Sequence, residues 1–389
     1  MGGDVVRDKF VSMHGEATVP PAQLPSDIPG FHGRQKELST LDELLAQRDR
    51  TPPGVPRIAV ITGTAGSGKT TLAVHWAHSV VSRFDGGHLY VDMKGYTPGN
   101  PPLRAVDALA RFLRALAVSG ESIVDDEQEC AARYRSEASR RGLLIVLDNV
   151  RSVEQVRPLL PANRDCLVLV TSRECLSELV PKGALLVEVG PFDAADSFAM
   201  LSRTLPPDRV ATEPGALARL GELCGHLPLA LALASGRLVA APGQSVAEYA
   251  DDLTAGDRLT ELAAGDASHT SVRAAFDVSF RGLPKPQRRL FSMLGLLPGS
   301  DFTAHTAAAI NSSPLPRTRG LLHRLVAAHL VQQTTPGRYQ LHDLLRLYAA
   351  ERAADQARRT EAEARLLRWY LCAADAAGQA INAGTVRLP

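Results

Sequence analysis

The sequence has few of the features that direct a chain to a membrane or to an oxidising compartment. Its five cysteines (Cys130, Cys166, Cys175, Cys224 and Cys372) form no CxxC pair and show no metal-ligand spacing, so neither a zinc module nor a disulfide framework is predicted. Residues 1–30 are polar and rich in Gly, Pro and Asp, which excludes a signal peptide. The apolar stretch 227–234 is too short to cross a bilayer. We therefore expect a cytoplasmic protein with no membrane partner.

The sequence also lacks an excess of charge of either sign. Its 43 basic and 42 acidic residues give a formal net charge of +1 at pH 7. This balance excludes a protein whose whole surface binds nucleic acid or anionic lipid, although it allows a local basic patch. With 389 residues, 45% of them hydrophobic, the chain is long and apolar enough for two to four domains.

The most specific feature that is present is a glycine-rich run followed by Thr71. It reads Gly63, Thr64, Ala65, Gly66, Ser67, Gly68, Lys69, Thr70 and fits the phosphate-binding loop pattern. Glycines leave backbone N–H groups free to form a nest for phosphate oxygens at a helix N-terminus. We expect Lys69 to bind the β- and γ-phosphates of a nucleotide and the Thr70 hydroxyl to bind magnesium. An apolar run before the loop and helical spacing after it supply the strand and helix that the motif requires.

Five short apolar runs predict the strands of one sheet. They are residues 57–62, 87–92, 143–147, 166–170 and 184–189. Helical segments separate these runs, and such alternation is typical of a parallel sheet with helices on both faces and ligands at the carboxyl ends of the strands. The predicted fold class is therefore α/β, a P-loop NTPase sheet covered by helices.

Polar residues follow two of these strands. Asp148 ends the third, where a carboxylate can hold magnesium through its water shell or cap the next helix. Its neighbour Asn149 is an amide and cannot take a proton from attacking water, so we predict slow ATP hydrolysis at most, with Asp92 as an alternative base. Arg173, after the fourth strand, is suited to a γ-phosphate contact; an ordinary solvated or ion-paired arginine is the alternative.

Beyond Pro191 the pattern becomes helical. The stretch 221–238 contains an apolar segment, 225–233, that predicts a buried helix with Pro228 in its first turn. Four helix candidates follow, at residues 272–280, 287–296, 303–310 and 317–328. Two short runs around a Thr-Pro-Gly turn come next and end at His342, and helices followed by a hairpin predict a winged helix.

Taken in order, these motifs resemble the NB-ARC module of the STAND signalling ATPases. The matching elements are residues 31–34, the phosphate loop, Asp148, 171–173, 225–230 and 341–343. Residues 75–78, 89–92, 146–149 and 342–349 are similar to large SARP-type antibiotic regulatory proteins of actinobacteria. The resemblance covers about residues 25 to 355 and departs at Leu341, where Met is usual, and at Asn149.

The resemblance implies a switch that binds ATP or ADP with Mg²⁺ and regulates a transcriptional activator. Lys69, Asp148 and Arg173 would serve the reacting phosphates, and Thr70 and Asp148 the metal. Arg34 would lie near the adenosine, Pro228 against the adenine, and His342 on the β-phosphate of ADP. ADP would hold a closed state, and ATP would favour an open, homo-oligomeric one. DNA would be contacted only through an N-terminal region that precedes the module in the family.

The expected domains and the alternative functions follow from this order. The domains are a linker (1–25), a P-loop nucleotide-binding domain (26–190), an ARC1-like helical domain (191–268), a winged-helix domain (269–355), and a helical segment (356–389) that could open a repeat array. We expect a regulatory core, either part of a longer protein or naturally short.

A DNA-binding module is the first alternative function, with Arg317, Arg319, His323 and Arg324 on the recognition helix. A P-loop phosphotransferase or motor ATPase is the second.

Overall fold

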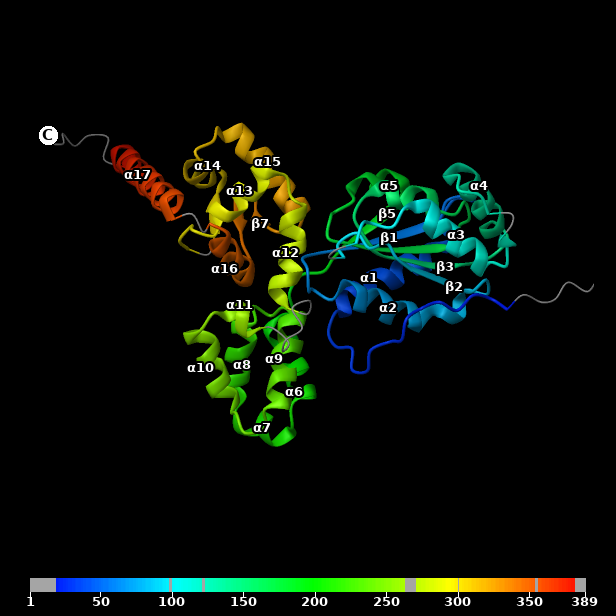
Figure 1. Cartoon of the computed structure of the whole chain (residues 1–389), viewed down its shortest axis with the longest axis horizontal. Coiled ribbons are helices and arrows are strands. Elements are labelled where there is room, and N and C mark those ends of the chain that lie inside the picture. The colour runs from blue at the N-terminus through cyan, green and yellow to red at the C-terminus, as the bar shows by residue number, and fades with distance from the viewer. Residues whose placement is uncertain are drawn as a thin grey trace, which may run out of the picture.

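The computed structural model describes residues 19–97, 100–120, 123–262, 271–299, 301–353 and 356–381. Figure 1 shows a sheet domain on one side and two helical groups, one above the other, beside it. The last helix, α17 (Gln356–Ile381), projects away from the upper group. Most of the predicted linker and residues 382–389 lie outside the described ranges.

The sheet domain is built on five parallel strands. They are β1 (Arg57–Thr62), β2 (His88–Asp92), β3 (Leu144–Val150), β4 (Leu167–Ser172) and β5 (Ala184–Glu188). Their order in the sheet is β2-β3-β4-β1-β5, and every adjacent pair is parallel. All five predicted strands are present, which confirms the α/β P-loop fold class. The third strand is longer than predicted, because it continues through Asp148 and Asn149 to Val150.

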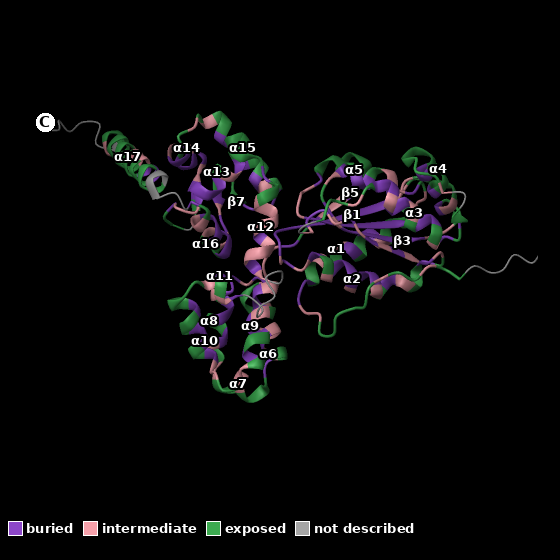
Figure 2. Cartoon of the chain, viewed as in Figure 1, coloured by how far each residue is buried: buried purple, intermediate pink, exposed green. Residues whose placement is uncertain are grey.

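Helices cover both faces of this sheet (Figure 1). One layer holds α1 (Gln35–Ala46) and α2 (Lys69–Val80), and the other holds α3 (Ala105–Ala115), α4 (Glu127–Ala138) and the short α5 (Val153–Val156). Short 3-10 turns connect them at Gln47–Arg50, Val81–Arg83, Arg157–Leu159 and Ser177–Lys182. Successive side chains of β1 enter opposite cores, since neighbouring residues of a strand point to opposite faces. The sheet is consequently buried on both sides (Figure 2).

The lower group contains six helices in its described residues. They are α6 (Ala194–Thr204), α7 (Pro207–Thr212), α8 (Pro214–Leu223), α9 (Pro228–Ala240), α10 (Val246–Ala255) and α11 (Arg258–Glu261). Pro228 occupies the first turn of α9, as predicted, where its missing N–H would have no helical partner. The next amide, Leu229 N–H, donates to the Gly66 carbonyl at 3.1 Å and so joins this group to the phosphate loop.

The upper group combines helices with a small antiparallel sheet. Its elements are α12 (Val272–Gly282), α13 (Lys285–Leu294), β6 (Asp301–Thr303), α14 (Ala304–Asn311), α15 (Leu315–Ala327), β7 (Gln332–Thr335), β8 (Arg338–Gln340) and α16 (Asp343–Arg352). The predicted helices and hairpin are present, whereas β6, which pairs with β8, was not predicted. A strand of three residues is too short to show alternation in the sequence.

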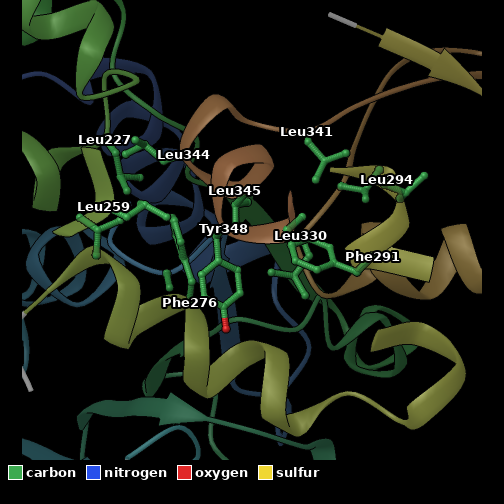
Figure 3. Close-up of a cluster of buried hydrophobic side chains, with 14 of the residues drawn as sticks. Leu227, Leu259, Phe276, Phe291, Leu294, Leu330, Leu341, Leu344, Leu345 and Tyr348 are labelled. Atoms are coloured by element: carbon green, nitrogen blue, oxygen red, sulfur yellow. The ribbon is translucent and has the colours of Figure 1, made fainter. Parts of the chain in front are cut away.

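The two helical groups share one hydrophobic core. Leu227 and Leu259 of the lower group and Leu344, Leu345 and Tyr348 of α16 belong to the same cluster of buried residues, which Figure 3 shows in close-up. Ala65 of the phosphate loop is part of it as well. Changes at the loop can therefore act on the packing of both groups. Among the helices of the described residues, none is long and apolar enough to cross a membrane.

Candidate nucleotide-binding site

A cavity of about 550 Å³ lies at the carboxyl ends of the strands, against the lower helical group. Three parts of the chain form its wall: the loop residues 65–71, the strand-end residues Asp148, Asn149 and 171–173, and an apolar side. The apolar side includes Ile28, Phe31, Phe192, Met200, Pro228, Leu229 and Ala232. Of the predicted site residues, only Gly63, Thr64 and His342 do not line the cavity.

Two of the loop glycines, Gly63 and Gly66, are required by the space around them. Gly63 has a φ of 152°, and a Cβ there would lie 2.2 Å from the Val189 carbonyl oxygen. Gly66 has a φ of 81°, and a Cβ would lie 2.9 Å from the Leu229 Cβ. The hydroxyls of Thr64 and Ser67 are buried without a hydrogen-bond partner in the described part of the chain. Buried polar groups normally have partners, so these orphaned donors suit a polar ligand in the loop.

Lys69 places a buried cationic group in this loop. Its ammonium donates to the Thr64 carbonyl at 2.8 Å, and no ion pair involves it among the residues that the structure describes. Burial, and secondarily the charge of Arg173, lower its pKa to about 7. A phosphate would supply the anion that this side chain lacks.

Asp148 is surrounded by hydroxyl groups. Its Oδ1 accepts hydrogen bonds from Thr70, at 2.8 Å, and from Thr171, and its Oδ2 accepts one from Tyr90 at 3.1 Å. The capping alternative does not match the structure, because the residue before α5 is Ser152. The adjacent hydroxyl of Thr70 and carboxylate of Asp148 are ligand types that Mg²⁺ prefers, so the residues present fit the predicted metal.

Asn149 makes a side-chain hydrogen bond to the neighbouring carboxylate of Asp92. It has a φ of 57°, and its amide nitrogen donates to Asp92 Oδ1 and to Thr97 Oγ1, both at 3.2 Å. The same Asp92 oxygen also accepts from the Lys94 N–H at 2.8 Å. Asp92 does not line the cavity. The alternative base is thus held in a structural hydrogen-bond network.

These contacts predict the effect of restoring an acid next to Asp148. Asn149→Asp should lower the free energy of unfolding by about 1–3 kcal/mol, because the amide donor is lost and two carboxylates face each other. The like charges should raise a carboxyl pKa in the folded state, so the destabilisation should grow as pH rises through that pKa. Thermal unfolding from pH 5 to pH 8 measures this. An equal Tm loss at every pH would contradict the charge argument.

Arg34 joins two segments of the cavity wall. It has a φ of 67° at the start of α1, and its Nη2 donates to the carbonyls of Ser67, at 3.1 Å, and Gly190, at 2.5 Å. Its guanidinium carbon lies 4.6 Å from the ring centre of Phe192. The predicted contact with adenosine stays a prediction, and the structure adds that Arg34 orders the loop.

Arg173 lines the cavity but is held by a helix of the upper group. Its Nη1 donates to the Ala275 carbonyl at 2.7 Å and to the Ser279 hydroxyl at 2.8 Å, both in α12. Its guanidinium lies 4.9 Å from the ring centre of Tyr96. Burial lowers its pKa to about 10, so it stays cationic at neutral pH. It is half-buried and, within the described ranges, not ion-paired.

His342 contacts the lower helical group rather than the cavity. Its Nε2 donates to the Gly225 carbonyl at 2.6 Å, while its Nδ1 is buried without a partner among the described residues. Burial lowers the pKa of this imidazole, which favours the neutral form with the proton on Nε2. The predicted contact with a β-phosphate is not tested by this arrangement.

Three of the residues around this site that sequence reasoning missed make direct contacts with predicted site residues. Tyr90, Phe192 and Ser279 contact Asp148, Arg34 and Arg173, respectively. The alternation of β2, which puts Tyr90 on the same face as Asp92, was the one available signal. The basic residues proposed for DNA reading, Arg317, Arg319, His323 and Arg324, are exposed on α15. Exposure alone is equally typical of a solvated face.

Comparisons with known proteins show that the chain is similar to part of two regulatory proteins. It is 39% identical over 371 residues to the regulatory protein AfsR of Streptomyces coelicolor, covering 92% of this chain. Identity to the regulatory protein AfsR of Streptomyces griseus is 38% over 362 residues, or 91% of the chain. The match covers 36% of each relative's length, so the chain spans about a third of these proteins. A shorter match, 27% over 157 residues, 40% of this chain and 12% of the relative, involves the Arabidopsis thaliana disease resistance protein RPP2B.

The fold comparison agrees with the sequence comparison. A Walker-type ATPase of Pyrococcus abyssi superposes with a TM-score of 0.53 over 84% of this chain and 98% of its own, at 13% identity. At that identity the likeness concerns the fold alone. No protein-family model matches the chain. The chain is therefore a relative of the AfsR regulatory proteins with a P-loop ATPase fold, and the predicted resemblance to SARP-type regulators is confirmed.

Proposed function

We propose that the chain is a nucleotide-dependent switch whose cavity binds ADP or ATP with Mg²⁺. This proposal rests on the position of the phosphate loop between the sheet domain and the helical groups. The Gly66 carbonyl accepts a hydrogen bond from α9, Ala65 packs in the core of the helical groups, and Lys69 is buried beside Arg173. A ligand at this loop is in a position to act on the arrangement of the domains.

The lining of the cavity combines two kinds of chemistry that suit a nucleotide. Lys69, Arg173 and the phosphate loop are its cationic and polar part, and Pro228, Leu229 and Phe192 belong to its apolar part. The cationic part suits phosphates, and the apolar part suits a flat base. The family resemblance makes that base adenine. Magnesium, when bound between Thr70 and Asp148, would neutralise phosphate charge.

The closed arrangement is held by contacts that a nucleotide can change. Arg173 binds α12, and His342 binds Gly225. We propose that ADP leaves this arrangement intact and that ATP favours an open one, in which copies of the module associate. Hydrolysis is slow, because Asn149 supplies no base. We propose that the chain is part of a longer cytoplasmic regulator. Its upper group, a winged helix, would pass the change in domain arrangement to a transcriptional activator.

The test is to identify and then titrate the nucleotide. The purified chain is denatured, the released nucleotide is identified by chromatography, and ADP, ATP and GTP are titrated into the emptied protein with Mg²⁺. We expect ADP or ATP to be released and both adenine nucleotides to bind at micromolar concentration or tighter, which is about −8 kcal/mol. Failure of both to bind at millimolar concentration would contradict the proposal.

The role of Arg173 leads to a separate prediction. Arg173→Ala should weaken ATP binding by about tenfold or more, since a charge-assisted contact to the γ-phosphate is lost. ADP binding should fall less. Calorimetry with both nucleotides measures the two losses, with Arg157→Ala as control, because Arg157 is exposed and pairs with Glu178 away from the cavity. Equal losses for ATP and ADP would argue against a γ-phosphate contact.

A further inference from the structure

Arg173 lines the cavity, as a γ-phosphate contact requires, but it also makes two hydrogen bonds to α12. The residue comes from the end of β4, yet both acceptors of its Nη1, the Ala275 carbonyl and the Ser279 hydroxyl, lie in α12, about a hundred residues further along the chain. Figure 1 shows α12 standing between the upper group and the strand ends. Arg173 is therefore a direct link between the cavity wall and the upper group.

The acceptors of Arg173 are neutral, although the side chain is half-buried and cationic. A carbonyl, a hydroxyl and the ring of Tyr96 surround it, and no ion pair involves it in the part of the chain that the structure describes. Hydrogen bonds from a charged donor to an anion are stronger than those to a neutral acceptor. A terminal phosphate entering the cavity would thus compete favourably with α12 for this guanidinium.

The Ala275 carbonyl and the Ser279 hydroxyl differ in how easily they can be replaced. The Ala275 carbonyl is a backbone group of α12 and is present whatever the side chain. The hydroxyl belongs to the side chain of Ser279, which is one turn further along the same helix face. Ser279 is consequently the residue whose identity sets how firmly α12 holds Arg173.

We propose that Ser279, acting through Arg173, sets the preference of the cavity for nucleoside triphosphate over diphosphate. In the closed arrangement Ser279 holds Arg173 on α12. A triphosphate that takes Nη1 as a donor to its terminal phosphate breaks this bond, and the breaking frees α12 from the strand ends. A diphosphate has no terminal phosphate for Arg173 and leaves the bond in place. Ser279 is in this sense a positioning residue, and the inference rests on the proposed nucleotide switch.

The experiment compares two substitutions that should act in opposite directions. Ser279→Ala removes one acceptor and should raise the ratio of ATP to ADP affinity about two- to tenfold, the value of one net hydrogen bond. Ser279→Asp gives Arg173 an anionic partner and should lower the same ratio by about tenfold. Calorimetric Kd values for ADP and a non-hydrolysable ATP analogue measure both, and thermal unfolding shows that each variant folds.

Two controls distinguish an effect of the Arg173–Ser279 hydrogen bond from a general effect of substitution on the structure. Ser292 is a buried serine of α13 whose one side-chain hydrogen bond in the described part of the chain goes to the Arg288 carbonyl of its own helix, so Ser292→Ala should leave the ratio unchanged. In an Arg173→Ala background, Ser279→Ala should no longer change the ratio, because the partner is gone. An unchanged ratio in Ser279→Ala and Ser279→Asp, or an equal shift with and without Arg173, would overturn the inference.

The outcomes also distinguish this inference from the proposed function. If the parent protein binds neither nucleotide, the nucleotide switch itself is wrong. If it binds both and the Ser279 variants keep the parental ratio, the switch stands and only the role of Ser279 is wrong.

Discussion

Lys69→Ala is expected to weaken ADP and ATP binding by about 100-fold or more, or roughly 3 kcal/mol, while the protein stays folded. The ammonium is the buried cation of the phosphate loop and donates only to the Thr64 carbonyl in the described structure. Removing it takes away the one cationic side chain of the phosphate loop itself, so part of the bound phosphate charge loses its partner in a buried loop. The fold should survive, because the folded protein gains little from a buried, uncompensated ammonium.

The measurement is calorimetric titration of the variant with both nucleotides. Lys36→Ala is the matched control, since Lys36 is an exposed lysine of the neighbouring helix α1. Parental ADP affinity in Lys69→Ala would contradict the assignment of the loop as the phosphate site.

The lowered pKa of Lys69 adds a pH dependence to the same prediction. The ammonium has a pKa of about 7 without ligand, and bound phosphate should raise this value, so binding takes up protons above pH 7. Since the bound state holds more protons, affinity should fall as pH rises above 7. Calorimetry in buffers of different ionisation enthalpy measures the uptake, which should be absent in Lys69→Ala. Equal uptake in parent and variant would assign the proton to another group.

His342→Ala is expected to loosen the closed arrangement and to speed ADP release by about tenfold, since an unpaired buried carbonyl costs about 1–3 kcal/mol. The imidazole comes from the residue before α16 and binds Gly225 of the lower group at 2.6 Å. This hydrogen bond joins the two helical groups and lies beside the turn that leads to Pro228.

Gly225 offers a second way to break the same contact. It has a φ of 58°, and a Cβ there would lie 2.4 Å from His342 Cε1, so Gly225→Ala should displace the imidazole as well as strain the backbone. Gly243→Ala is its control, because nothing lies within 4 Å of a Cβ at that position. His305, exposed on α14, is the control for His342. Displacement of a fluorescent ADP analogue measures release, and parental rates in both test variants would contradict a role of the His342–Gly225 hydrogen bond in retaining ADP.

Local sequence patterns were sufficient for the sheet domain. Each strand is a short, mostly apolar run, and β1, β3 and β4 are buried on both faces. Such runs are recognisable without tertiary information. The phosphate loop was recognisable for the same reason, because its glycines satisfy local backbone demands. Asn149 predicted the lack of a base from its chemistry alone.

Only the tertiary structure decided the partners of these residues. Arg173 on Ser279, His342 on Gly225 and Asn149 on Asp92 join positions 106, 117 and 57 residues apart. No local pattern records such pairs, since they arise when separate elements pack and buried polar groups must find a donor or acceptor. The sequence by itself determined the helices and strands and the chemistry that each carries. Packing determined which of these residues meet, because hydrogen bonds depend on distances that the chain order does not contain.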